Sequence, residues 1–99
     1  MATQMRTYSM KEGQLENWNR MFESKIRDLR SRQGFALEGA WSVPDRGQFV
    51  WILSYPGGRE DFERADQAYY ELPEHGPLHI EALEYLEGGD SVFVDPVSL

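Results

Sequence analysis

The stretch Gln48-Phe49-Val50-Trp51-Ile52-Leu53-Ser54-Tyr55 decides the fold of this 99-residue chain. Its centre, Phe49–Leu53, is apolar at every position, so a strand here presents hydrophobic side chains on both faces of a sheet. Such a pattern is typical of a strand that is buried from two sides. Helices of so short a chain are expected to cover one face, and a second copy of the chain is the simplest cover for the other.

A second strand is expected immediately before this one, at Phe35–Val43. The connecting residues Pro44–Gly47 predict a tight hairpin, because proline presets φ and glycine tolerates positive φ. Strict alternation would place four apolar residues on one face of the earlier strand: Phe35, Leu37, Trp41 and Val43. Glu38 then lies on the other face, between two alanines.

A long amphipathic helix is predicted upstream, from Glu12 to about Arg32. Apolar residues recur there at steps of three and four, with Met21 at the margin of the stripe: Leu15, Trp18, Phe22, Ile26 and Leu29. Gly34 is a natural stop. Ahead of this helix, an alternating strand at about Gln4–Met10 places Arg6, Tyr8 and Met10 on one face.

The remaining sequence completes the architecture. Its apolar spacing and its proline and glycine positions predict a helix, a short helix and a last strand, at Arg59–Leu72, Pro77–Glu87 and Ser91–Val97. The order of elements is β-α-β-β-α-(α)-β, the split βαβ pattern. The whole chain, residues 1–99, is therefore expected to form one α+β domain, a ferredoxin-like βαββαβ sandwich with a four-stranded antiparallel sheet.

Composition narrows the classes of function. The chain has no cysteine and a net charge of −7, and it contains no apolar run long enough to span a bilayer. Residues 1–33 carry a net +3 and residues 34–99 a net −10, so the acidic remainder of the chain would repel phosphate. We expect a cytoplasmic protein that binds neither nucleic acid nor membrane.

Arg6 and Tyr8 are the first candidates for a functional site, because they share one face of a strand expected to be central. An arginine in a cleft between sheet and helices can bind a carboxylate or an enolate oxygen, and a tyrosine can donate a proton or a hydrogen bond. The alternative is that Arg6 forms a structural ion pair and Tyr8 fills the core.

Aromatic residues are the second group of candidates. Trp51, Tyr55 and Tyr69 suit the walls of a pocket for a flat apolar ligand, although aromatic residues also dominate cores and dimer interfaces. Tyr69 and Tyr70 are adjacent on a helix, so only one of them can face the core.

His75, His79 and Glu38 complete the candidate list. His75 and His79 are four residues apart, but Gly76-Pro77 between them is expected to keep them off a common helix face, and no metal site is predicted. His75 remains a candidate general acid or base. Glu38 is a candidate partly buried base, with a dimer rim or a pairing with arginine as the alternative. No motif for a phosphate, a cofactor or a metal occurs, and we expect none of these groups.

Several dispersed segments resemble NIPSNAP-family domains. They are Met5–Gly13, in which Glu12 stands where the family usually has proline, together with Arg30–Phe35, Gly39–Trp41, Phe49–Tyr55 and Ala68–Glu74. The resemblance implies a dimeric α/β barrel, in which two such domains back their sheets against each other. It implies no agreed activity, because relatives by fold include cofactor-free monooxygenases, enzymes of aromatic metabolism and haem proteins.

Two functions are compatible with the sequence. The first is an enzyme or binding protein for a small apolar or aromatic molecule held between sheet and helices without a metal. The second is a non-catalytic homodimeric module. An open pocket bearing Arg6 or Tyr8 would favour the first, and a space filled by side chains would favour the second.

Overall fold

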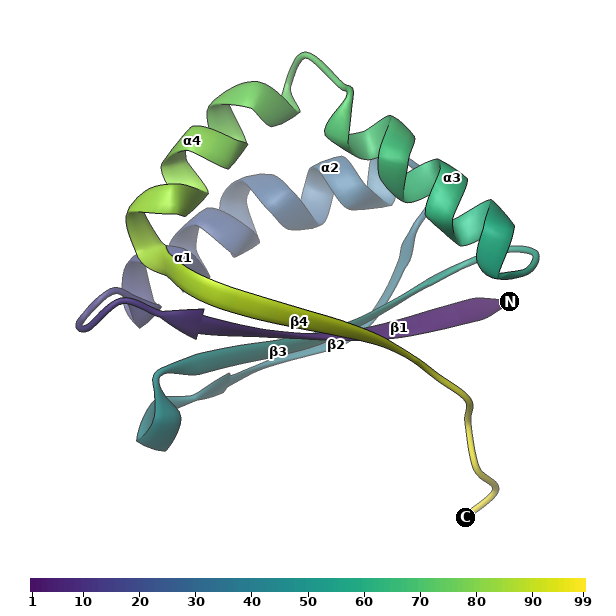
Figure 1. The fold of residues 1–99 in the computed structure, drawn as a ribbon, viewed down its shortest axis with the longest axis horizontal. Helices are drawn as coiled ribbons and strands as arrows, with labels where there is room; N and C mark the ends of the chain where they lie inside the picture. Colours follow the sequence, from purple (N-terminus) through teal and green to yellow (C-terminus); the bar gives the residue numbers. More distant parts are fainter.

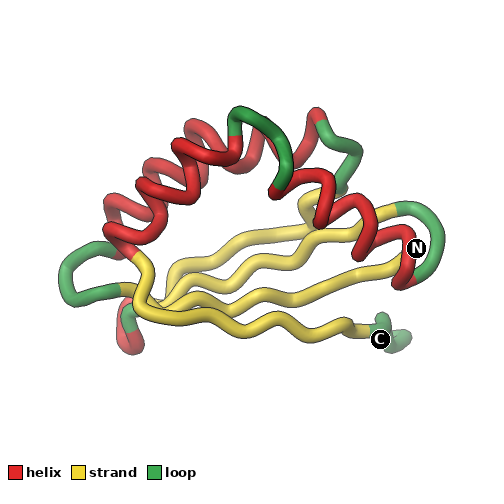
Figure 2. Tube along the Cα trace, turned by 45° about the horizontal axis from the view of Figure 1, so that its top comes forward, coloured by secondary structure: helices red, strands yellow, loops and turns green.

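The α-helices and the strands form two layers, with all four α-helices on the same face of one sheet (Figures 1 and 2). The computed structural model describes residues 1–99. Its strands are β1 (Ala2–Met10), β2 (Ala36–Val43), β3 (Gln48–Tyr55) and β4 (Leu86–Val94). Its main helices are α1 (Leu15–Met21), α2 (Arg27–Arg32), α3 (Arg59–Tyr70) and α4 (His75–Tyr85). None of the helices combines the length and the apolar composition that spanning a bilayer requires.

The four strands pair in the order β2-β3-β1-β4, and every neighbouring pair is antiparallel. This is the strand order of a ferredoxin-like α+β fold, so the predicted fold class is confirmed. The β3 prediction matches the observed strand at both ends. Phe49, Trp51 and Leu53 of β3 are buried beneath the helices, whereas Val50 and Ile52 point to the opposite face.

That opposite face, here called the open face, carries no α-helix (Figure 2). The strand register places apolar side chains on it from all four strands: Met5, Trp41, Val43, Val50, Ile52, Val92 and Val94. Trp41 is 53% exposed and Val92 is 42% exposed. The expectation that this chain covers only one face of its sheet is therefore met.

The predicted alternation of Phe35–Val43 is wrong in its second half. A β-bulge lies between Leu37 and Gly39, so Glu38 has no partner in β3 and the alternation changes phase. Leu37 consequently faces the helices, whereas Trp41 and Val43 face the open side. The hydrophobic pattern of the sequence does not reveal such a bulge, because the shift of register appears only in the pairing with the neighbouring strand.

The first helix starts at Leu15 rather than at Glu12, because Gly13 takes φ 76° and turns the chain. A π-helical segment, η1 (Phe22–Ile26), joins α1 to α2. A step of four residues rotates by slightly more than one full turn in an α-helix and by slightly less than one in a π-helix. The two rotations therefore compensate each other along α1, η1 and α2. Positions 18, 22, 26 and 30 are all buried as a result, and so is Met21, which the sequence placed at the margin.

The C-terminal quarter differs most from expectation. β4 begins at Leu86 and contains Gly88-Gly89, which we predicted to end a helix, and it finishes two residues before Pro96. Gly89 lies opposite Tyr8, and a Cβ atom there would come within 2.9 Å of the Tyr8 ring. The glycine therefore serves side-chain packing across the two strands rather than helix termination.

Candidate functional site

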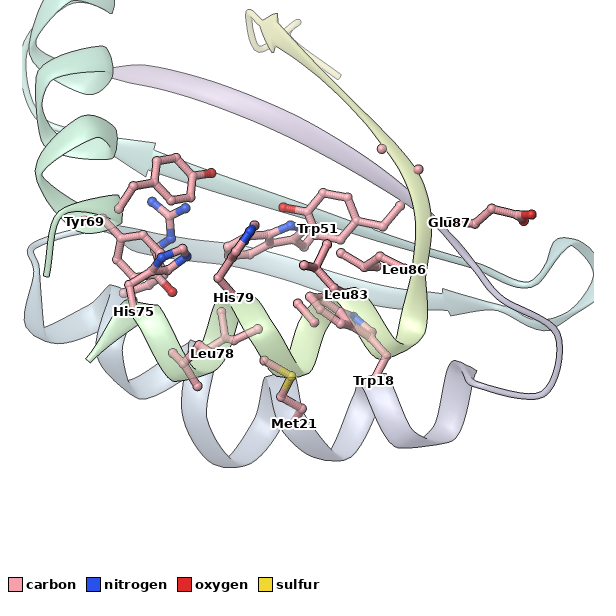
Figure 3. A pocket seen from close by; sticks show the side chains of 17 residues that line it. Trp18, Met21, Trp51, Tyr69, His75, Leu78, His79, Leu83, Leu86 and Glu87 are labelled. Carbon is pink, nitrogen blue, oxygen red and sulfur yellow. The ribbon is translucent and has the colours of Figure 1, made fainter. Parts of the chain in front are cut away.

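A cavity of about 420 Å³ lies between α4, the α1–α2 helix and the β1–β3–β4 part of the sheet (Figure 3). Its walls are mainly apolar and aromatic, including Trp18, Met21, Trp51, Tyr69, Leu78 and Leu83. The cavity forms because α4 contributes no fully buried side chain, so this helix roofs the sheet without filling the space below it. The sequence could not indicate this spacing between α4 and the sheet.

Tyr8 lies on the wall of the cavity, where strand alternation points it toward the helices. Its ring makes edge contacts with Trp18 and Trp51, at centroid distances of 5.4 and 6.4 Å. These contacts hold the ring in place, and Gly89 leaves room for it.

Arg6 lies deeper, and it does not line the cavity. Its guanidinium donates from Nε to the Gln4 side chain at 2.7 Å, from one terminal nitrogen to the Tyr70 hydroxyl at 2.9 Å, and from the other to Asp66 at 2.9 Å. Burial by itself lowers the pKa of Arg6, but the neighbouring Tyr8, Tyr70 and Asp66 more than offset this effect and raise it. The structure thus places Arg6 in the structural ion pair that we considered as the alternative.

Arg30 reaches the cavity instead. It is 2% exposed, and one terminal nitrogen donates to the same Asp66 oxygen that Arg6 uses, at 2.8 Å. Its guanidinium lies 3.6 Å from the centre of the Tyr69 ring, a cation–π contact. Of the two predicted aromatic neighbours, Tyr69 is buried and Tyr70 is 45% exposed, as their spacing required.

The sequence analysis missed Arg30 and Asp66, although a signal for each was present. Arg30 follows Ile26 by four residues, and Asp66 follows Phe62 by four, so both charges fall on the apolar stripes of their helices. A charge on a buried helix face usually has a partner. Here the two unexpected charges are partners of each other.

His75 and His79 both lie on α4 and both line the cavity, so the expectation that they do not share a helix face is wrong. Their ring centroids are 5.9 Å apart (Figure 3). Pro77 falls in the first turn of α4, where backbone N–H groups have no partner within the helix, and proline is tolerated there. No group of three or more His, Asp or Glu residues is placed to hold a metal ion.

The pKa of His75 is lowered from its ordinary value, by burial first and then by the nearby His79 and Arg30. The unfolded chain therefore binds a proton at His75 more readily than the folded chain does. His75 therefore makes its full contribution to the free energy of unfolding above the ordinary histidine pKa of about 6.5. This contribution is lost as the pH falls below that value.

We expect this loss to be measurable with the variant His75→Gln. Urea unfolding of wild type should show a larger decrease in stability between pH 7.5 and pH 5.5 than unfolding of the variant does. Other carboxylates titrate in both proteins, so the difference between the two decreases isolates His75. Equal decreases would contradict the lowered pKa.

Tyr55 and Glu38 lie away from the cavity. Tyr55 packs against Phe35, with ring centroids 5.0 Å apart, at the far end of β3. Glu38 is exposed at the bulge of the edge strand β2, and the partly buried base that we considered is not formed. The structure therefore brings together Tyr8, Trp51, Tyr69 and His75 from the predicted residues and leaves out Arg6, Tyr55 and Glu38.

The fold and its single-sided helix layer define the ferredoxin-like class of folds, and structures of antibiotic biosynthesis monooxygenases have the same fold. One such monooxygenase structure is 15% identical to this chain with a TM-score of 0.73, and the alignment covers 99% of this chain and 100% of that one. Within this class the chain has the fold of NIPSNAP domains, as the predicted resemblance implied.

Two NIPSNAP structures illustrate the likeness. An uncharacterised NIPSNAP domain protein from Burkholderia xenovorans is 19% identical with a TM-score of 0.86, over 99% of this chain and 96% of that one. A NIPSNAP family protein from Agrobacterium tumefaciens is 11% identical with a TM-score of 0.87, and the alignment covers 97% of this chain and 92% of that one. No family model matches the sequence, and no curated protein matches it. The likeness is therefore one of fold.

Proposed function

We propose that this protein belongs to the NIPSNAP family and binds a small apolar or aromatic molecule in the cavity beneath α4. The observation that carries the proposal is the cavity itself. Its volume of about 420 Å³ lies within the usual range for small-molecule sites, roughly 300–1,000 Å³. Indole, phenol and aliphatic side chains form most of its surface, with few polar groups among them.

Tyr8 and His75 are the side chains through which such a site would act on its ligand. Both line the cavity, and each carries a group that donates or accepts a proton. The lowered pKa keeps His75 neutral near pH 7, so it can accept a proton there. Arg6 acts on the ligand only through its neighbours, since its donors are directed to Gln4, Tyr70 and Asp66.

A variant that fills the cavity tests the proposal. Ala82 lies on α4 and lines the cavity, so Ala82→Phe should place a ring in the space the ligand needs. In a thermal-shift screen of aromatic acids, flavins and haem, we expect at least one ligand to raise the Tm of wild type. The variant should lose that shift.

The matched control is Ile80→Phe on the same helix. Ile80 is 67% exposed and does not line the cavity, so this variant should keep the ligand-induced shift. A screen in which no ligand raises the Tm of wild type would contradict the proposal, as would a shift that survives in Ala82→Phe.

A second proposal concerns the open face, which fits a second copy of this chain. Asp90 is the one charged residue at the paired positions that point to this face, and apolar residues of four strands form its centre. An apolar surface with a single charged residue can pair with its own copy about a two-fold axis and offers little to a charged partner. A homodimer is compatible with a ligand site and equally with a non-catalytic module. A cytoplasmic location stays a prediction.

A further inference from the structure

The fold contains more buried positive charge beside the cavity than the neighbouring residues neutralise. Arg6 and Arg30 share one carboxylate oxygen of Asp66, and their side chains are only 4% and 2% exposed. Two guanidinium groups against one carboxylate leave a net charge of +1 inside the fold. A buried charge without a partner is unfavourable, and it attracts an anion to the nearest accessible space.

No other residue around the cavity supplies the missing negative charge. On α4, the lowered pKa of His75 favours its neutral form, and His79 carries no negative charge in either form. On β4, Glu87 is exposed, and its side chain points out from the rim (Figure 3). The uncompensated charge therefore faces the cavity from Arg30, the one arginine that lines it.

Unpaired hydrogen-bond donors point to the same conclusion independently of charge. Arg30 Nε, Trp18 Nε1 and Trp51 Nε1 are buried and make no hydrogen bond to another residue. All three belong to residues that line the cavity, and each residue is at most 3% exposed. No unpaired acceptor belongs to the cavity, since the remaining buried unpaired atom is on Asn19, outside it. A ligand that pairs with these donors must carry hydrogen-bond acceptors.

We infer that the cavity takes a ligand with a flat apolar body and one anionic oxygen group, a carboxylate or an enolate. Arg30 holds the anionic group, and Trp51, whose ring centre lies 5.7 Å from the Arg30 guanidinium, supplies its indole N–H as a further donor. Charge-assisted hydrogen bonds from a guanidinium to an oxyanion are among the strongest in proteins. This inference rests on the proposed ligand site and adds the chemistry of its polar end.

Three probes of similar shape and different charge test it: 2-naphthoate, 2-naphthamide and 2-naphthylmethylammonium. Calorimetric titration of the full chain should give 2-naphthoate at least a tenfold lower Kd than the neutral amide, and no binding of the cation. Equal affinity for naphthoate and naphthamide would overturn the anionic group while leaving the ligand site intact. Failure of all three probes would overturn this inference, whereas the ligand site itself is decided by the thermal-shift screen.

Two variants then locate the anionic group. Arg30→Lys removes Nε, and Trp51→Phe removes the indole N–H while keeping a ring, so each should reduce the preference for naphthoate over naphthamide. The control is Arg32→Lys, because Arg32 is on the same helix with a side chain 59% exposed and should keep the wild-type preference. If Arg30→Lys does not fold, Trp51→Phe and the wild-type preference decide the outcome. An unchanged preference in every folded variant would overturn the assignment.

Discussion

Replacing Asp66 by alanine should cost the protein about 3–5 kcal/mol of stability, because the change leaves two buried guanidinium groups without a partner. Arg6 and Arg30 both donate to Asp66, at 2.9 and 2.8 Å. Neither can move into water without taking apart the packing of β1, α2 and α3. A domain of this size is stable by roughly 5–15 kcal/mol, so the variant should be near the limit of folding. Urea unfolding monitored by circular dichroism measures the effect.

Two further variants separate the ion cluster from a general sensitivity to losing a carboxylate. Asp66→Asn keeps an oxygen that accepts from both arginines, so it should lose less stability than Asp66→Ala. Asp28→Ala removes an exposed pair with Arg32, of 2.9 Å, and should cost less than about 1 kcal/mol. If Asp66→Ala and Asp28→Ala unfold at the same urea concentration, the ion cluster does not stabilise the fold as we argue.

The same cluster shows why the fold was more predictable than the site. Hydrophobic periodicity specified β3, the α1–α2 helix and α3, because each buries a continuous apolar stripe against the sheet. Those regularities also fixed the strand order, once the ferredoxin-like pattern was recognised. Arg30 and Asp66, in contrast, depend on a contact between two helices, and the two residues are 36 positions apart in the chain. Periodicity can flag such a charge, but it cannot identify its partner.

The errors at the chain's periphery have local physical causes. The bulge after Leu37 and the glycines of β4 both depend on packing between neighbouring strands, and a single sequence does not show that packing. The helix was predicted to begin at Pro77, which left His75 and Gly76 outside it, yet the first turn of a helix accepts both Gly76 and Pro77. That error affected the predicted site, because it placed His75 and His79 on different faces, whereas both side chains line the cavity.

Placing a charge at the centre of the open face should separate the proposed dimer into monomers. Ile52 points to this face, pairs with Met5 of β1 and Gly39 of β2, and lies on an inner strand of the sheet. In Ile52→Lys two ammonium groups would be buried against apolar surface near the two-fold axis, without partners. We expect wild type to sediment at micromolar concentration as a dimer of the 11.5 kDa chain, and the variant as a monomer.

A matched substitution on the helical side distinguishes the open face from any other contact. Ile80 of α4 is 67% exposed, so Ile80→Lys makes the same chemical change on the opposite layer and should leave the dimer intact. Circular dichroism of Ile52→Lys should retain the native spectrum, since its side chain points away from the helices. A wild-type monomer would contradict the dimer. A dimer lost in Ile80→Lys but kept in Ile52→Lys would move the interface to α4, the helix that covers the ligand site.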